Sequence, residues 1–148
     1  MPGQIEVPVP GLEGDIQLAS VFETLATNVT HVISTNEASG VTMRWEASGP
    51  WVPFLNFFNP EWRINVHMEG IGSLGDLDFG PAIVAWNSVP IGPGPSKTWT
   101  GTVNIPAAAV PAGAYKLVTT LQLYTSGGGA ALPVYGFEDG PVVSYFSP

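Results

Sequence analysis

The side chains best suited to metal or acid–base chemistry are few and lie far apart along this chain. It has two histidines, His31 and His67, and no cysteine that could join them. A transition-metal site needs three or four ligands that converge on one point. His67 also falls on the polar side of an alternating segment, where it is expected to face solvent. We therefore predict no metal site at either histidine.

Acidic residues are the second kind of candidate. Asp76 and Asp78, in the sequence GDLDFG, could offer two carboxylates to calcium, and Glu69, Glu138 and Asp139 could approach them in space. Calcium prefers six to eight oxygen ligands, and the longer acidic pattern of an EF-hand loop is missing. Two acids in a glycine-rich turn more often accept hydrogen bonds from backbone amides. We predict this capping role, with calcium as the alternative.

No catalytic constellation is visible in the sequence. Nucleophilic catalysis needs a serine or cysteine next to a histidine and an acid, and no Gly-x-Ser-x-Gly segment occurs. A pair of carboxylates could cleave glycosides, but no spacing singles out such a pair. We predict a protein that is not an enzyme, with no catalytic residue and no cofactor.

The charge content narrows the classes of partner. The 148 residues include 4 basic and 12 acidic side chains, for a formal net charge of −8. Four cations cannot follow a phosphate backbone, so nucleic acid is excluded as a partner. Charged residues make up only 11% of the chain, whereas soluble surfaces carry about 25–35%. The surface is therefore either coated with small polar residues or partly apolar and covered by a partner.

The sequence carries no visible membrane or export signal. No apolar run reaches the roughly 18 residues of a membrane span. The first residues also lack a basic region followed by an apolar stretch, which a cleaved signal peptide would need. We expect a cytoplasmic protein by default, with export by another route left open.

Two alternating segments, 97–105 and 113–124, dominate the rest of the chain. Apolar residues recur at every second position in both, which is typical of half-buried β-strands. Pro106 cannot donate to a strand ladder and so ends the first segment. The residues expected to face inward are Trp99, Val103, Ile105, Tyr115, Leu117, Leu121 and Leu123.

This pair of strands carries a resemblance to a known fold. A strand ending in Ile105-Pro106, a short connector and the run AGAYKLV resembles the E–F corner of bacterial immunoglobulin-like and fibronectin-like β-sandwiches. The resemblance covers residues 97–124 and implies that Tyr115 is a tyrosine corner, with its hydroxyl bonded to nearby backbone. We expect an all-β, immunoglobulin-like antiparallel β-sandwich of about seven to nine strands. The disulfide of antibody domains is absent, because the chain has no cysteine.

The beginning of the chain is predicted to be an extended arm over residues 1–13, followed by a single sandwich domain over 14–148. Ile5, Val7 and Val9 alternate with two prolines between them. Such a segment can pair only at the edge of a sheet. We therefore expect the arm to add a strand to a neighbouring molecule.

Further strands and loops follow from the same alternation. The ambiguous segment 22–34 has helical spacing but residues that favour extended structure, and we predict strand. Loops are expected at 70–81 and 87–96. The other expected strands cover residues 15–22, 40–46, 61–69, 82–86, 132–137 and 142–146.

An aromatic segment, GPWVPFLNFFNP at 49–60, has two interpretations. It contains no charge and four aromatic side chains, Trp51, Phe54, Phe57 and Phe58. It could fold over one end of the sandwich as a lid on the core. It could instead expose anchors for a partner, because aromatic residues carry much of the energy at interfaces. Three other tryptophans, Trp45, Trp62 and Trp99, fall on inward faces and are expected in the core.

From these observations we predict a non-enzymatic structural or protein-interaction module. The leading hypothesis is a subunit or decoration protein of a larger assembly, with another protein or itself as partner. The alternative is a carbohydrate-binding module, in which Trp51, Trp86 or Tyr124 would stack on sugar rings. The predicted partner-binding residues are Trp51, Phe54, Phe57, Phe58, Ile5, Val7 and Val9.

Overall fold

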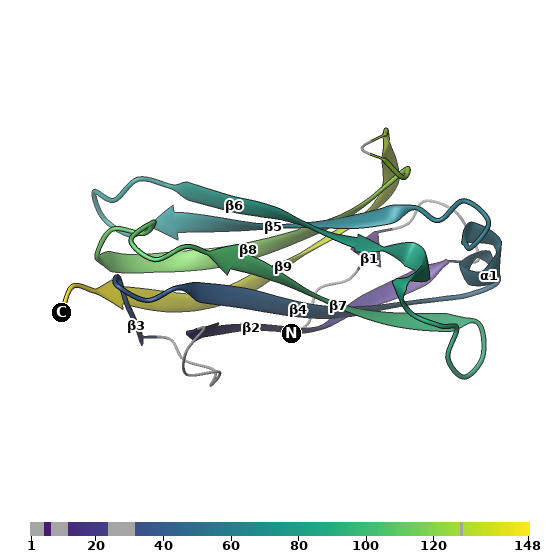
Figure 1. Cartoon of the computed structure of the whole chain (residues 1–148), viewed down its shortest axis with the longest axis horizontal. Helices are drawn as coiled ribbons and strands as arrows, with labels where there is room; N and C mark the ends of the chain where they lie inside the picture. The colour runs from purple at the N-terminus through teal and green to yellow at the C-terminus, as the bar shows by residue number, and fades with distance from the viewer. Residues whose placement is uncertain (1–4, 7–11, 24–31, 128) are drawn as a thin grey trace.

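The chain is an all-β protein built from two sheets. The computed structural model describes residues 5–6, 12–23, 32–127 and 129–148. Within this part, the strands form one six-stranded and one three-stranded sheet, which lie one above the other along an elongated molecule (Figure 1). No helix in the described part of the chain is long and apolar enough to cross a membrane.

The larger sheet has the order β1-β9-β8-β5-β6, and β3 pairs with β9 in parallel. All its other pairings are antiparallel. Its strands are β1 (Ile5–Glu6), β3 (Val32–Ser34), β5 (Glu61–Gly70), β6 (Leu77–Ala85), β8 (Gly113–Tyr124) and β9 (Ala131–Phe146).

The smaller sheet has the order β2-β4-β7, with antiparallel neighbours. Its strands are β2 (Glu13–Glu23), β4 (Ser39–Ser48) and β7 (Ser96–Ile105). The edge strands β6 and β7 of the two sheets run side by side. A Cβ at Gly101 of β7 would crowd the side-chain ends of Ile64, Val84 and Trp45, so the packing between the sheets favours a glycine at this position.

The core lies between the sheets and follows the predicted alternation. Trp45, Trp62 and Trp99 are fully buried, as expected, and Trp86 joins them from a 3₁₀ turn, η1 (Trp86–Ser88). Neighbouring ring centroids in this cluster lie 4.7–6.3 Å apart. Packed aromatic rings of this kind bury large apolar areas. The cluster packs β4 and β7 of the smaller sheet against β5 of the larger sheet.

The connection from β7 to β8 crosses from one sheet to the other. Tyr115, at the start of β8, is 1% exposed, and its hydroxyl donates to the carbonyl oxygen of Pro111 at 2.8 Å. The buried Tyr115 and its backbone bond are therefore confirmed. Its ring also packs edge-on against Tyr145 of β9, whose hydroxyl pairs with that of Ser39.

Several predicted boundaries are wrong. The predicted strands 132–137 and 142–146 are one strand, β9, because its pairing with β8 continues through irregularities. Residues 77–81 belong to β6 rather than to a loop, because Leu77 and Asp78 pair with β5. Part of the 49–60 segment is a short helix, α1 (Trp51–Leu55). Within the predicted strand 22–34, residues 24–31 lie outside the described part.

Candidate functional site

The helix α1 forms because its prolines stand where they can be tolerated. Pro50 caps the helix and Pro53 lies in its first turn, where backbone amides have no helical partner in any case. Val52 is fully buried and anchors the helix to the core. The turn ends at Asn59, which adopts a left-handed conformation with φ 42°.

The four predicted aromatic anchors lie together on α1 and the turn that follows it. Trp51 is 38% exposed, Phe54 46%, Phe57 86% and Phe58 61%. Phe54 contacts both Trp51 and Phe58 edge-on, with ring centroids 4.9 and 5.3 Å apart. We call these four residues the aromatic cap. The segment thus combines both interpretations, because Val52 closes the core while the aromatic cap faces outward.

An apolar hollow lies beside the aromatic cap. It has a volume of about 160 Å³ and is lined only by apolar residues: Leu12, Trp51, Leu55, Leu123 and residues 132–134. A second depression, of about 230 Å³, is lined by Pro50, Trp51 and Phe54. Trp51 therefore borders both depressions.

Hydrogen bonds hold the end of α1 against η1. The Nε1 of Trp86 donates to the side-chain oxygen of Asn56 at 2.8 Å, and Asn87 Nδ2 donates to the backbone oxygen of Asn56 at 3.0 Å. The backbone amide of Asn87 donates to Asn59 Oδ1 at 3.0 Å. Asn56 and Asn59 thus use their side chains to fix the orientation of the aromatic cap.

A buried lysine, Lys97, lies next to the hydrogen bonds between α1 and η1. It was not singled out in the sequence analysis. Lys97 is 3% exposed, and its Nζ donates to the backbone oxygen of Trp86 at 3.1 Å. Trp99 Nε1 donates to the same oxygen at 3.1 Å. Burial lowers the pKa of Lys97, since the charged form loses hydration. The alternation of β7 could have revealed it, because Lys97 shares the inward face with Trp99.

The end of the molecule that carries α1 is made of uncharged connections. The links β4–β5, β6–β7 and β8–β9 contain no Asp, Glu, Lys or Arg. The register brings them to one end, since Ser48 pairs with Ser96, and Glu61 pairs with both Ala85 and Tyr124. This end lies opposite the C-terminus along the long axis (Figure 1). We call it the uncharged end.

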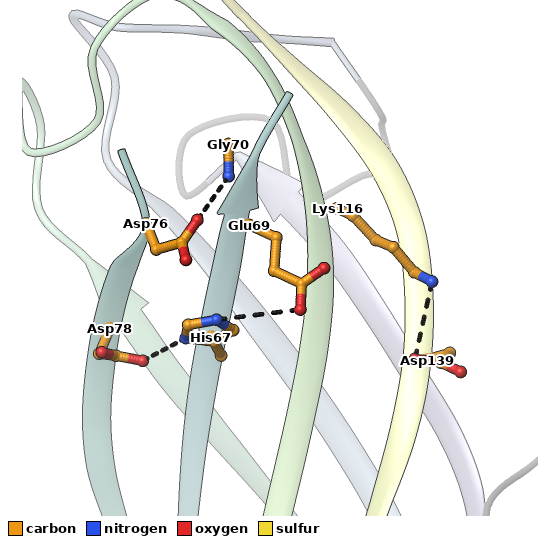
Figure 2. Close-up of polar contacts among 7 residues, drawn as sticks. All are labelled: His67, Glu69, Gly70, Asp76, Asp78, Lys116 and Asp139. Atoms are coloured by element: carbon orange, nitrogen blue, oxygen red, sulfur yellow. Dashed lines mark hydrogen bonds and ion pairs between the residues drawn. The ribbon is translucent and has the colours of Figure 1, made fainter. Parts of the chain in front are cut away.

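Charges gather toward the opposite end of the larger sheet (Figure 2). His67 Nδ1 donates to Asp78 Oδ1 at 2.6 Å, and Nε2 lies 4.0 Å from Glu69. The hydrogen bond to Asp78 is the main cause that raises the pKa of His67. Lys116 lies 3.9 Å from Asp139.

This charged cluster bears on the predicted capping and calcium roles. Asp76 accepts a hydrogen bond from the backbone amide of Gly70 at 3.2 Å, which confirms the capping role for Asp76. Asp78 instead binds the imidazole of His67. Among the described residues, no three His, Cys, Asp or Glu side chains are placed to hold a metal ion. His31 lies outside the described residues.

Of the predicted partner-binding residues outside the aromatic cap, only Ile5 is described by the structure. Ile5 is only 7% exposed and pairs through β1 with β9, so its side chain belongs to the core of this chain. Val7 and Val9 lie outside the described residues. Trp86 is fully buried and offers no face to a sugar. The ring of Tyr124 is half-buried and lies under the guanidinium of Arg63, 4.2 Å from its centroid.

Comparisons of the sequence with models of known protein families and with curated proteins find no match. The surface itself must therefore indicate the function. An exposed aromatic cap beside an apolar hollow is suited to non-covalent docking, because both gain free energy when water leaves them.

Proposed function

We propose that the protein is a non-enzymatic interaction module that docks a protein partner, within a larger assembly, through its uncharged end. The observation that carries this proposal is the exposure of the four aromatic side chains of the aromatic cap. Large exposed aromatic clusters are unusual on monomers and mark interaction sites.

The energetics support a docking role for this end. Complete burial of one large apolar side chain is worth about 1.5–3 kcal/mol, so two or three anchors can sustain association. The three uncharged connections add no ion that must lose its hydration on contact. An ion pair close to this end, between Arg63 and Glu61, is already formed within the chain at 3.1 Å.

The strand order supports an immunoglobulin-like or fibronectin-like sandwich as the finer description of the fold. The sheet β2-β4-β7 corresponds in chain order to strands A, B and E, and β5, β8 and β9 correspond to C, F and G. Strand β6 lies next to β5, as an added strand does in variable-type domains. The loops of such sandwiches lie at the two ends of the domain, and in this protein one of these ends is the uncharged end that carries the aromatic cap.

A protein partner accounts for this surface better than a carbohydrate does. Of the three residues that could stack on sugars, Trp86 is in the core and Tyr124 is covered by Arg63. Trp51 remains, but it borders depressions lined by apolar residues. Sugar rings also need nearby hydrogen-bonding groups, whereas the side-chain oxygens of Asn56 and Asn59 already accept hydrogen bonds from Trp86 and Asn87.

Site-specific photo-crosslinking in the native host tests this function. A photoreactive phenylalanine replaces Phe57 in one variant and Phe146 in a matched control, since Phe146 is 45% exposed at the opposite end. Position 57 is expected to give discrete protein adducts that vanish when Phe54→Asp is added, and position 146 is not. Equal labelling at the two positions would contradict the proposal.

A further inference from the structure

We propose that the occupant of the uncharged end is a second copy of this chain, docked end to end about a twofold axis. Phe57 of each copy enters the apolar hollow of the other copy. This inference rests on the proposed function, because it names the partner of the same surface.

The projection and the hollow lie on the same end of one chain. Phe57 is the most exposed of the large apolar side chains in the described part, at 86%, and follows Leu55, which lines the hollow. A twofold interface needs one self-complementary patch in which each copy offers both partners of every contact. The aromatic cap and the hollow together meet this requirement.

The hollow has the size and chemistry of a phenyl site. An apolar protein cavity of about 150 Å³ is large enough to bind benzene. The hollow measures about 160 Å³, and all its lining residues are apolar. A ring inserted there would displace water and contact accessible lining side chains such as Trp51 and Leu132, and no buried polar group would be left unpaired.

The exposed aromatic area matches what a stable dimer needs. With roughly 200 Å² per aromatic side chain, the exposed fractions of the aromatic cap leave on the order of 450 Å² in each copy. A standard interface buries about 800 Å² per partner, of which somewhat more than half, about 450 Å², is non-polar. The aromatic cap alone therefore supplies the apolar share of one such interface.

The position of the acidic cluster around Glu69 and Asp78 is compatible with this contact between two acidic molecules, although Glu13, Glu46 and Glu61 lie on strands close to the docking end. Two copies with a net charge of −8 repel each other unless their acidic surfaces stay apart. Strand β5, Glu61–Gly70, has 10 residues and spans about 30 Å at about 3.3 Å per residue. End-to-end docking thus places the clusters around Glu69 and Asp78 about 60 Å apart, far beyond the screening length of about 8 Å.

Sedimentation equilibrium of the purified full chain, from about 1 µM to about 1 mM, tests the proposal. The wild type is expected to form dimers and no larger species. Phe57→Asp should weaken the dimer at least roughly thirtyfold, as loss of a buried aromatic anchor implies. The matched control Phe146→Asp, at the opposite end, should leave the dimer unchanged. Circular dichroism verifies that both variants remain folded.

Cysteine pairing then tests the geometry, because the chain has no native cysteine. One variant carries Phe57→Cys and another carries Pro133→Cys, in the lining of the hollow. Under mild oxidation, this mixture should give a cross-linked dimer much faster than a mixture of Phe57→Cys and Ile71→Cys. Ile71 serves as the control because it is half-exposed and follows β5 at the end opposite to the uncharged end.

Three results would overturn the inference: a wild type that stays monomeric, a dimer that survives Phe57→Asp, or no 57–133 cross-link above the control. Flotation with phosphatidylcholine vesicles adds a further arm, because vesicle binding by a monomer would assign the aromatic cap to a membrane surface. If the purified protein is monomeric while adducts at position 57 persist in the host, only the second copy is excluded. If those adducts are absent too, the proposed function fails as well.

Discussion

At the scale of single residues, His67 connects β5 and β6 through its bond to Asp78. Its pKa is raised in the folded protein above the ordinary value of 6.5. The stabilisation is therefore complete below about pH 6.5 and is lost as the pH rises through the folded pKa. Asp78 is 79% exposed and His67 is 35% exposed, so solvent screens the pair and its contribution is at most about 1 kcal/mol.

Replacing His67 by Gln should remove this pH-dependent part of the stability. Urea unfolding of the wild type and of His67→Gln is compared at about pH 5.5 and about pH 8.5. The difference between the two proteins should be larger at the lower pH. A difference that is equal at both values, or larger at the higher one, would contradict the role of the Asp78 bond.

Lys97 changes the stability of the fold with pH in the opposite direction to His67. Burial lowers its pKa from 10.5, so the charged form opposes folding below the folded pKa, and stability rises as the pH increases toward 10.5. Lys97→Met keeps the volume without the charge, and Trp86 O keeps its bond from Trp99. We expect Lys97→Met to be neutral or stabilising at pH 7, by up to about 2 kcal/mol.

Lys97→Ala is the matched comparison, because it removes the charge and also leaves a cavity, which costs stability. Unfolding by urea at about pH 7 and about pH 9.5 measures both variants. The advantage of Lys97→Met over the wild type should shrink at the higher pH. A large loss of stability in Lys97→Met would mean that its hydrogen bonds outweigh the burial of its charge.

At the scale of elements, the corner between β7 and β8 depends on Tyr115. Tyr115→Phe removes the donor to Pro111 and is expected to cost about 1 kcal/mol in the free energy of unfolding. Tyr135→Phe serves as the control, because Tyr135 is half-exposed, and it should change stability by less than about 0.5 kcal/mol. Equal effects in the two variants would show that the buried bond does not secure the corner.

In α1 and the turn after it, different residues stabilise the fold and form the binding surface. Val52→Ala removes fully buried methyl groups and should lower the free energy of unfolding by about 2 kcal/mol. Phe57→Ala removes a ring that is mostly in water, so the monomer should lose less than about 0.5 kcal/mol. Thermal unfolding at low protein concentration compares them. A large loss for Phe57→Ala would assign the aromatic cap to the core as a lid.

At the scale of the whole molecule, the surface that we propose for docking consists of uncharged connections, and the charged residues nearest to it, such as Glu13 and Glu61, lie on the adjoining strand ends. Contacts made by uncharged side chains gain nothing from Coulomb attraction, whereas the distant acidic clusters repel weakly. Raising NaCl from about 0.05 to about 0.5 M should therefore change the dimer dissociation constant less than about threefold, and any change should strengthen association. Sedimentation at the two salt concentrations measures this. A strong weakening by salt would indicate ionic contacts instead.

Much of the fold could be predicted because the alternation of apolar and polar residues along a strand indicates which side chains are buried. In β7 from Lys97 to Ile105 and in β8 from Tyr115 to Leu123, every second residue faces inward and is buried, and this includes Lys97. Tyr115 was predicted from its neighbours in the sequence, since a corner is a local motif. The division of β9 into two strands was wrong: Gly140 and Pro141 resemble a turn in the sequence, but they lie at an irregularity, and β9 pairs with β8 on both sides of it.

The candidate site, like the fold, was predictable from the sequence only in part. The sequence by itself determined that the 49–60 segment is aromatic and uncharged, that no catalytic set is recognisable, and that the chain is all-β. It could not decide which side chains of α1 face outward, because five helical residues are too short for a periodic signal. Tertiary packing decided that Val52 is buried, and antiparallel pairing between distant strands decided that Ile5 joins the core and that three uncharged connections lie at one end. Such long-range contacts depend on register across the sheets, which a linear pattern does not encode.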